Sequence, residues 1–338
     1  MRLLVTGGLG FIGSNFIRYM LNKYDYEIIN FDKVTYCADI NNLREFENDN
    51  RYHLVIGDLC RKKDIIKILS IYEPTHIVHL AAESHVSNSI EDSEIFIESN
   101  VVGTYNLLEL SKGYDIERII VTDSDEVYGP VDGYVKEDAL LNPTSPYSAS
   151  KASASLISHS YYHMFKLPVI NVRPSNNYGP YQYPEKVVPI FITNALRELR
   201  LPIQGDGSHR RNWLYVEDTC SAIDLLLHKG KNGEIYNIGS KFECSIKDLA
   251  VIILGRLNLP RSFITFSEER LSDDYRYGID TTKIENLGWK EEYYFAKGIG
   301  ETIEWYRNNV NWWESKVMQY ASNFKYYNAE NQGEKTNS

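Results

Sequence analysis

Short runs of apolar residues alternate with segments of helical periodicity through the first half of the chain. The apolar runs cover residues 3–6, 28–31, 54–56, 77–80, 119–122 and 169–172. The segments between them include residues 11–21 and 101–110, where apolar side chains recur at the spacing of one helix face. Right-handed strand–helix–strand units bury both faces of a sheet, so the pattern predicts an α/β fold with a doubly wound parallel sheet. Ligands of such sheets bind at the carboxyl ends of the strands.

The alternation ends after Val172, and the chain then changes character. Residues 173–180 are rich in Gly, Pro and Asn, which is typical of a loop. Residues 213–216 and 222–227 look like a return to the first sheet and its helices, so we expect a smaller, discontinuous second region. The predicted division is a first domain of residues 1–175 with returns near 212–250, an α+β substrate-binding region within 176–316, mainly 176–211 and 251–316, and a polar, frayed tail at 317–338.

The composition is that of an ordinary globular protein and argues against several classes of function. The chain has 338 residues, of which 43% are hydrophobic and 24% charged, so it can bury a core without disulfides or metals. A net charge of −10 argues against binding to nucleic-acid phosphates. No apolar stretch approaches the roughly 18 residues of a membrane span. The N-terminus does not have the pattern of a signal peptide.

The cysteines indicate a reducing environment. Cys37, Cys60, Cys220 and Cys244 are widely scattered and form no Cys-x-x-Cys pair. This spacing argues against a zinc site and against a disulfide framework. We therefore expect a cytoplasmic protein without a bound metal.

A glycine-rich turn follows the first apolar run and opens the first helical segment. Gly7, Gly10 and Gly13 permit a tight turn and let the backbone approach a pyrophosphate at a helix N-terminus. Such a cluster alone could be a plain turn. Asp32, however, ends the second apolar run 19 positions after Gly13, where a carboxylate accepts from both hydroxyls of an adenosine ribose and repels a 2′-phosphate. The pattern therefore predicts a Rossmann-type domain that binds NAD rather than NADP.

Further residues near the ends of the expected strands complete the predicted cofactor site. Asp58 could accept from the adenine amino group, although Asp is also common in ordinary loops. Lys33 slightly weakens the preference for NAD, and Ala81 and Ala82 leave room for the dinucleotide. The residues expected to contact the cofactor are Gly7, Gly10, Phe11, Ile12, Gly13, Asp32, Lys33, Asp58, Leu59, Leu80, Ala81, Ala82, Tyr147 and Lys151.

Two carboxylic acids precede a Tyr-x-x-x-Lys pair. Asp125 and Glu126 follow the fifth apolar run, and Tyr147 and Lys151 lie one helical turn apart about 20 residues later. A tyrosine kept acidic by a lysine can take a proton from a sugar hydroxyl while a cofactor takes the hydride. The carboxylates could then supply the acid and the base of an elimination, provided that one of them holds a proton. The alternatives are a chance Tyr–Lys spacing and a charged strand end.

Six motifs together resemble the extended short-chain dehydrogenase/reductase superfamily and, within it, the nucleotide-sugar 4,6-dehydratases. They lie at residues 6–13, 81–86, 124–129, 147–151, 175–180 and 183–186, and the resemblance extends from residue 1 to about residue 313. It implies a tightly held NAD, a homodimer built on a four-helix bundle, and conversion of a nucleoside-diphosphohexose to its 4-keto-6-deoxy derivative. The reaction would be redox neutral, because the hydride removed from C4 returns to C6.

The resemblance also implies roles in the reaction. Tyr147 would be the base for the 4-hydroxyl, and Lys151 its electrostatic partner and a ribose contact. Ser124, where the family usually has threonine, would face the sugar 4-oxygen. Asp125 would protonate the departing 6-hydroxyl, and Glu126 would remove the proton from C5, which is acidic once C4 is a ketone.

On the substrate side, the resemblance assigns two arginines to the diphosphate. Arg211 and Arg276 match these positions, and guanidinium groups suit phosphate because two of their donors engage two oxygens. Lys186 could instead be a solvated surface lysine, and His85 a structural histidine. The full set of expected substrate residues is Ser84, His85, Asn177, Lys186, Arg211, Asn237 and Arg276.

Departures from the family pattern also lie on the substrate side. Ser87 and Asn88 replace an acid and a base, Asn212 replaces an aspartate, and Tyr275 replaces an arginine. These changes leave the residues of the reaction intact, but they leave open which nucleotide and which sugar the protein binds. The first expectation is dTDP-glucose, with UDP-glucose and UDP-N-acetylglucosamine as alternatives.

Three other functions fit parts of the sequence. A nucleotide-sugar 4-epimerase shares the fold, the cofactor and the Tyr–Lys pair but has no use for Asp125 and Glu126 as acid and base. A net NAD-dependent oxidoreductase would accumulate reduced cofactor. A dinucleotide-binding scaffold without catalysis need not retain the residues of the reaction.

Overall fold

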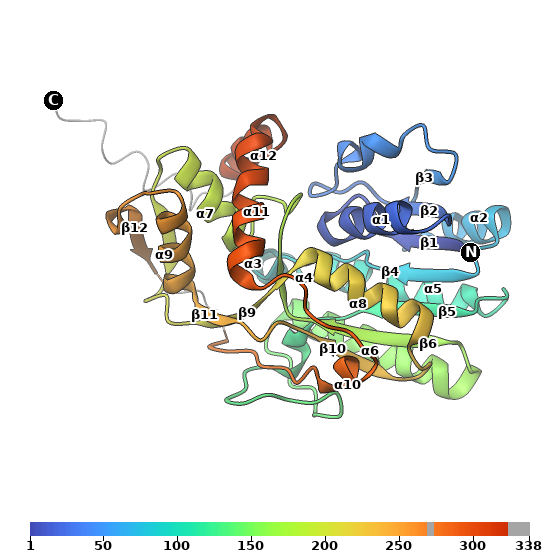
Figure 1. Ribbon diagram of the computed structural model, residues 1–338. Helices are drawn as coiled ribbons and strands as arrows, with labels where there is room; N and C mark the ends of the chain where they lie inside the picture. The colour runs from blue at the N-terminus through green and yellow to red at the C-terminus, as the bar shows by residue number, and fades with distance from the viewer. Residues whose placement is uncertain (269–273, 324–338) are drawn as a thin grey trace.

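A seven-stranded sheet forms the larger part of the protein, whose computed structural model describes residues 1–268 and 274–323 (Figure 1). Its order is β10-β6-β5-β4-β1-β2-β3, and every neighbouring pair is parallel. The strands are β1 (Arg2–Thr6), β2 (Glu27–Asp32), β3 (Tyr52–Ile56), β4 (His76–His79), β5 (Arg118–Thr122), β6 (Val169–Pro174) and β10 (Ile235–Ile238). The six apolar runs of the sequence are the first six of these strands, which confirms the predicted doubly wound sheet.

Helices cover both faces of this sheet. One face packs against α1 (Phe11–Lys23) and α8 (Val216–Lys229), and the other against α2 (Lys62–Tyr72), α5 (Gly103–Ser111) and α6 (Pro146–Phe165). Successive strand residues alternate between the two cores, so Leu3 and Val5 join one and Leu4 the other. Burial on both faces explains why the strands are continuously apolar rather than alternating.

A second region lies beside the carboxyl edge of the sheet, to the left in Figure 1. It contains a three-stranded sheet, β11-β9-β7, and a two-stranded parallel sheet, β12-β8. Its own core, which includes Tyr178, Phe191 and Trp313, is separate from the two cores of the large sheet. Its elements are β7 (Asn176–Tyr178), α7 (Val187–Leu196), β8 (Leu201–Gln204), β9 (Arg210–Tyr215), β11 (Glu243–Ser245), α9 (Ile246–Arg256), β12 (Ile264–Ser267), α11 (Phe295–Asn308) and α12 (Val310–Asn323).

Short helices occupy several connections. They are η1 (Ile40–Phe46), α3 (Val86–Glu91), α4 (Ser93–Phe96), η2 (Ile97–Val102), η3 (Asp125–Tyr128), η4 (Arg261–Phe263) and α10 (Thr282–Asn286). In the part of the chain that the structure describes, no helix has the length and apolar character needed to cross a membrane.

Two sequence expectations about the second half need correction. Residues 213–216 do not return to the large sheet, because residues 213–215 lie in β9, which pairs with β7 and β11. The strand that does return is β10, which lies within the predicted return near 212–250, although no strand was predicted at its residues. The helix expected at 222–227 is confirmed as part of α8 on the large sheet. Helix α12 extends to Asn323, into the predicted tail, and residues 324–338 lie outside the described residues.

Candidate active site

A large cavity lies between the carboxyl edge of the seven-stranded sheet and the second region. Its volume is about 1390 Å³, which exceeds the roughly 300–1,000 Å³ of a pocket for one drug-sized ligand. The residues that follow β1, β2, β4, β5 and β6 line one wall, and residues of β7, β8, β9 and α7 line the other. All predicted catalytic and cofactor residues line this cavity, as do all predicted substrate residues except Asn237 and Arg276. The space suffices for a dinucleotide beside a second ligand.

The glycine turn forms the floor of the cavity at the start of α1. Gly7 has a φ of 72°, and a Cβ placed there would lie 2.6 Å from the Cα of Ala81. A Cβ on Gly13 would lie 2.1 Å from the carbonyl oxygen of Gly7. Gly10 is the N-cap residue of α1 and carries no side chain that could cap the helix. The first-turn amides can therefore face an anion in the cavity, and the backbone around them leaves no room for side chains.

Asp32 ends β2 beside this turn. Its Oδ2 accepts from the amide of Leu9 at 2.9 Å, and its Oδ1 accepts from the amide of Val34 at 2.7 Å. These bonds fix the carboxylate at the cavity wall, although burial raises its pKa. Beyond it, the Nζ of Lys33 lies 3.0 Å from the Oδ2 of Asp58. Lys33 is therefore neutralised by Asp58, so its charge does not offset the preference of Asp32 for unphosphorylated ribose.

Helix α6 presents Tyr147 and Lys151 to the cavity from its first turns. A capping box between Ser145 and Ser148, with Pro146 at the first helical position, fixes where the helix begins. Tyr147 is 8% exposed and Lys151 7%, so both side chains are buried in the wall. The Nζ of Lys151 donates to the carbonyl of Thr122 at the end of β5.

The carboxylate pair begins a 3-10 helix directly after β5. Ser124 is its N-cap, and the Ser124 hydroxyl accepts from the amide of Glu126 at 3.2 Å. The same hydroxyl donates to the Oδ1 of Asp125 at 3.4 Å. The Oδ2 of Asp125 is buried without a hydrogen-bond partner. The turn therefore directs one carboxylate into a closed environment, beside a second carboxylate and the α6 tyrosine.

The electrostatics separate the two carboxylates. Burial raises the pKa of Asp125 to about 8, and the adjacent charge of Glu126 adds to the effect, while Arg211 opposes it. Asp125 is therefore protonated at neutral pH and can act as an acid. Burial lowers the pKa of Lys151 to about 8. Burial also raises the pKa of Tyr147, assisted by Glu126, so the protein alone does not make this tyrosine a strong base.

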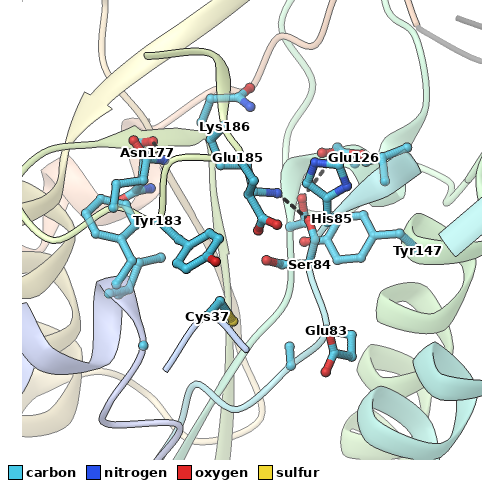
Figure 2. Close-up of a pocket in the computed structure, with 18 of the residues that line it drawn as sticks. Cys37, Glu83, Ser84, His85, Glu126, Tyr147, Asn177, Tyr183, Glu185 and Lys186 are labelled. Atoms are coloured by element: carbon cyan, nitrogen blue, oxygen red, sulfur yellow. Dashed lines mark hydrogen bonds between the residues drawn. The ribbon is translucent and has the colours of Figure 1, made fainter. Parts of the chain in front are cut away.

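Several predicted substrate residues meet in the cavity near this centre (Figure 2). The Nζ of Lys186 donates to the carbonyl of Ser84 at 2.6 Å. His85 is 4% exposed, and its Nδ1 accepts from the amide of Asn88 at 3.4 Å, so part of its function is to cap α3. Asn177 accepts from the hydroxyl of Thr219 at 2.6 Å, which fixes its amide. The structure thus brings these residues together.

Arg211 and Arg276 have different surroundings. Arg211 lines the cavity, with its guanidinium over the ring of Tyr277 at 4.7 Å. Arg276 does not line it, because its Nε and Nη2 lie 2.8 and 2.7 Å from the Oε2 of Glu243. Its Nη1 donates to the carbonyl of Gly133 at 2.7 Å. The guanidinium of Arg276 is thus used within the protein, and its predicted contact with the diphosphate gains no support from this position.

Asn237 also lies away from the cavity. It is fully buried in β10, and its Oδ1 accepts from the hydroxyl of Tyr128 at 2.8 Å. Its Nδ2 donates to the carbonyls of Val135 and Asp280 at 3.1 and 3.2 Å. These bonds join three segments beneath the site, so the expected substrate contact of Asn237 is not supported by its position.

The cavity wall also holds polar groups that the sequence did not single out. Several of these side chains have a buried oxygen without a hydrogen-bond partner, a state that is costly unless a ligand or water completes it. They are Thr122, Ser175, Asn176 and Gln182. Ser175 and Asn176 belong to the motif that contains Asn177, and only their position at the strand end could have indicated them. Among the described residues, no group of three or more His, Cys, Asp or Glu side chains could hold a metal ion.

Comparison with known proteins agrees with this geometry. The chain belongs to the GDP-mannose 4,6 dehydratase family, which it matches over residues 4–302. It is 42% identical to the low-salt glycan biosynthesis protein Agl12 of Haloferax volcanii, over 90% of this chain and 98% of that protein. It is 40% identical to dTDP-glucose 4,6-dehydratase of Salmonella typhimurium, over 92% of this chain and 94% of that enzyme.

The fold agrees in the same way with solved structures. The dTDP-glucose 4,6-dehydratase DesIV of Streptomyces venezuelae, solved with NAD bound, superposes with a TM-score of 0.91 at 41% identity. The match covers 94% of this chain and all of that one. The α/β architecture, with its mostly parallel sheet and its cavity at the carboxyl edge, is thus that of a nucleotide-sugar dehydratase.

Proposed function

We propose that the protein converts dTDP-glucose to its 4-keto-6-deoxy derivative with bound NAD. The observation that carries the proposal is the acid pair of η3, of which Asp125 is buried and Glu126 half-buried, beside the tyrosine and lysine of α6. Burial raises the pKa of Asp125 to about 8, next to Glu126, whereas a simple dehydrogenase or an epimerase needs neither group. The names of the relatives support the nucleotide and the sugar.

The residues fit the cofactor. The glycine turn has backbone contacts that a Cβ would violate, and α1 directs its uncapped first turn at the same space. Asp32 is held at the adjacent strand end by two backbone amides, where it can accept from ribose hydroxyls. When held there, the cofactor would supply the hydride acceptor for C4 and the hydride donor for C6.

The first step needs a base at the sugar 4-hydroxyl. Tyr147 would take this proton, with Lys151 as the buried cation that stabilises the tyrosinate. Ser124 would hold the 4-oxygen, since its hydroxyl faces the cavity from the end of β5. All three side chains come from rigid elements, which favours an aligned proton transfer.

The second step needs a base at C5 and an acid at the 6-hydroxyl. Glu126 would remove the C5 proton, which is acidic next to the C4 ketone, and the protonated Asp125 would give its proton to the departing hydroxyl. One molecule of water then leaves across C5 and C6. When the hydride returns to C6, Glu126 would give the proton that it took back to C5. This division of roles needs a protonated acid at position 125, and the burial of Asp125, which raises its pKa to about 8, provides it.

The anionic half of the substrate would lie against the second wall. Arg211 and Lys186 supply positive charge there, and the forked donors of Arg211 suit a diphosphate. UDP-glucose and UDP-N-acetylglucosamine stay alternatives, because Ser87 also lines the cavity where the family pattern has an acid. We assign Arg276 and Asn237 to support of this wall rather than to substrate contact.

We also propose that two copies form a homodimer. Helices α4 to α6 expose apolar side chains, among them Ile95 at 44%, Val102 at 39%, Leu156 at 61% and Met164 at 75%. Helix α6 packs against α4, η2 and α5, so these side chains can form one surface, and a second copy would complete a four-helix bundle. Sedimentation at micromolar concentration should give twice the mass of one chain, and a single-chain mass would contradict the proposal.

A cytoplasmic location is the remaining proposal from the sequence. Cys37, Cys60, Cys220 and Cys244 are free thiols in the structure, which supports a reducing compartment. Fractionation of cells that express the protein should place it with cytosolic markers.

Incubation of the purified protein with dTDP-glucose tests the proposed reaction. Mass spectrometry should detect a product lighter by one water, formed over many turnovers without added cofactor. An unchanged mass with altered ring stereochemistry would instead indicate a 4-epimerase. Accumulation of reduced nicotinamide in proportion to product would indicate a net oxidoreductase. Parallel incubations with UDP-glucose and UDP-N-acetylglucosamine decide the nucleotide and the sugar.

A further inference from the structure

Asp123 is a buried carboxylate at the end of β5 that the proposed reaction does not use. Its side chain is 0% exposed, and the residue lines the cavity. It directly follows Thr122, whose carbonyl accepts from the Nζ of Lys151, and it precedes Ser124. Asp123 therefore lies between the residue that Lys151 contacts and the acid pair of η3, and its charge interacts with that of Lys151.

Groups from one strand, β6, and one helix, α6, hold this carboxylate. The Nδ2 of Asn171 donates to its Oδ1 and Oδ2 at 3.4 and 3.2 Å, and the Nε of Arg173 lies 3.6 Å from Oδ2. Ser155 of α6 adds a hydrogen bond. The Arg173 side chain is 2% exposed, so the ion pair is closed to solvent. An arginine this deeply buried needs a nearby anion.

The other partners of Arg173 are neutral. Its guanidinium donates to the Tyr128 hydroxyl at 2.7 Å, the Ser155 hydroxyl at 3.1 Å and the Glu137 carbonyl at 3.3 Å. Ser155 lies one helical turn after Lys151, on the same face of α6. Asp123 therefore serves two buried cations, one on β6 and one on α6. Arginine does not lose its proton in proteins, so lysine is the cation that responds to this carboxylate.

We propose that Asp123 is a positioning residue that supplies the negative charge beneath Lys151, keeps this lysine protonated during catalysis, and so sets the pH window in which Tyr147 can act. The inference rests on the proposed function, which assigns Lys151 and Tyr147 to the first step. Asp123 touches neither substrate nor cofactor in this account and acts through the lysine.

The charges around Lys151 agree with this role. Burial lowers the pKa of Lys151 to about 8, and Asp123 is the group that opposes this decrease. Burial raises the pKa of Asp123 itself, against the effects of Arg173, Lys151, Ser155 and Asn171.

The other titratable groups that the structure describes near Lys151 do not supply a negative charge that acts on it. On β4, burial and Lys151 lower the pKa of His79 to about 3, so its ring is neutral. On η3, Asp125 is protonated at neutral pH, and the charge of Glu126 raises the pKa values of Asp125, Tyr147 and Tyr277 but does not act on Lys151. On α6, burial raises the pKa of Tyr147, and the charges of Glu126, Asp125 and Asp123 add to this increase. The lysine thus depends on Asp123 more directly than on the acid pair.

Competitive labelling of Lys151 tests the inference without any substrate. The free protein and its Asp123→Asn variant are treated with trace acetic anhydride across a pH series, and acetylation of the peptide that carries Lys151 is measured by mass spectrometry. The variant should reach half-maximal labelling about one pH unit lower, because an opposite charge nearby shifts a pKa by 1–3 units. An unchanged midpoint in the folded variant would overturn the proposal.

The pH dependence of turnover gives the second readout. In Asp123→Asn both limbs of the profile should move to lower pH, since Lys151 loses its proton earlier and Tyr147 no longer has this negative neighbour. A merely structural role would lower turnover at every pH and leave both limbs in place, which would contradict the inference.

Two further variants control for folding. Asp218→Asn changes another buried carboxylate, 1% exposed and held by the amides of Glu292 and Tyr293, and should leave the Lys151 midpoint unchanged. If Asp123→Asn does not fold, Asn171→Val removes one donor to Asp123 and should shift the midpoint in the same direction by less; no shift there contradicts the proposal.

A wild-type protein that dehydrates no sugar nucleotide defeats the proposed function alone, whereas the labelling result decides the role of Asp123.

Discussion

The two walls of the cavity are built from different kinds of parts. The wall at the carboxyl edge of the large sheet consists of tight backbone turns and small side chains, such as Gly7, Gly13 and Ala81. The opposite wall comes from short strands and α7 and presents long cationic side chains, among them Lys186 and Arg211. The first wall therefore tolerates little added volume, and the second responds mainly to a change of charge.

This division also separates the chemistry from the choice of substrate. The five residues assigned to proton transfer follow β5 or lie in the first turns of α6, both elements of the large sheet and its helices. The departures from the family pattern lie outside this centre: Ser87 is in α3, which follows β4, and Asn212 is in β9 of the second region. A rigid reaction centre can thus keep one mechanism while the residues around it change the substrate.

Replacing Tyr147 with Phe should have the largest effect on turnover. The substitution removes the proposed base at the 4-hydroxyl, and general-base catalysis contributes about 10²- to 10⁴-fold. Single-turnover absorbance should detect no reduced nicotinamide, and thermal unfolding should stay near that of the wild type because the ring is kept. A variant that still reduces the cofactor at the wild-type rate would contradict the assignment.

Replacing Glu126 with Gln should separate the two halves of the reaction. Water loss should fall by about 10²-fold or more, since the base at C5 is gone. Oxidation at C4 precedes that step, so reduced nicotinamide should still form in a single turnover and then persist. Loss of both signals in the folded variant would refute this order of steps.

Adding a methyl group to the glycine turn tests the rigidity of the first wall. Gly13→Ala places a Cβ about 2.1 Å from the Gly7 carbonyl, so the protein should lose NAD during gel filtration and unfold at a lower temperature. The control is Gly255→Ala in α9, which has nothing within 4 Å of the new Cβ. It should stabilise the protein by about 0.5–1 kcal/mol. Equal changes in NAD retention and unfolding temperature in the two variants would contradict the close packing at Gly13.

The two arginines provide a matched pair for the second wall. Arg211→Met should raise the KM about 10- to 100-fold with a smaller change in kcat, because a charged hydrogen bond contributes about 1.5–3 kcal/mol. Arg276→Met should lower the free energy of unfolding by breaking the pair with Glu243, and its KM should change little. The opposite pattern of KM values would contradict the assignment of Arg211, rather than Arg276, to the diphosphate.

The burial of Asp125 should appear as a smaller effect, on stability. Its pKa is raised to about 8, so the folded protein holds a proton that the unfolded chain releases above about pH 4. The unfolded state then binds fewer protons, and stability falls with rising pH between these values. Asp125→Asn removes this penalty, so its advantage in urea unfolding should grow between pH 5 and 7, by at most about 1.4 kcal/mol per pH unit. A constant difference would contradict the raised pKa.

The sequence was informative where one local rule decided the structure. The parallel strands were predictable because burial on both faces makes each a continuous apolar run, and strand ends then place Asp32, Asp125 and the α6 pair at one edge. The return near 212–250 was predicted, but the strand that makes it, β10, was not located because it has only four residues and includes the polar Asn237. Residues 213–216 were assigned to the wrong sheet because an apolar run does not specify its neighbour.

Tertiary pairing decided the rest. Arg211 and Arg276 have the same chemistry in the sequence, and only the contact of Arg276 with Glu243, 33 positions away, removes it from the cavity. The amide of Asn237 is used by residues about 100 and 43 positions distant. Asp123 was not singled out in the sequence, and its link to Arg173 became visible only when β5 and β6 paired.

The central claim is that hydrogen removed from C4 of the sugar returns to C6 while acidic neighbours remove the oxygen between. dTDP-glucose with deuterium at C4 tests this most directly, with the product examined by NMR and mass spectrometry. We predict that the deuterium appears in the C6 methyl group of the 4-keto-6-deoxy product. A product whose methyl group contains no deuterium would contradict the account.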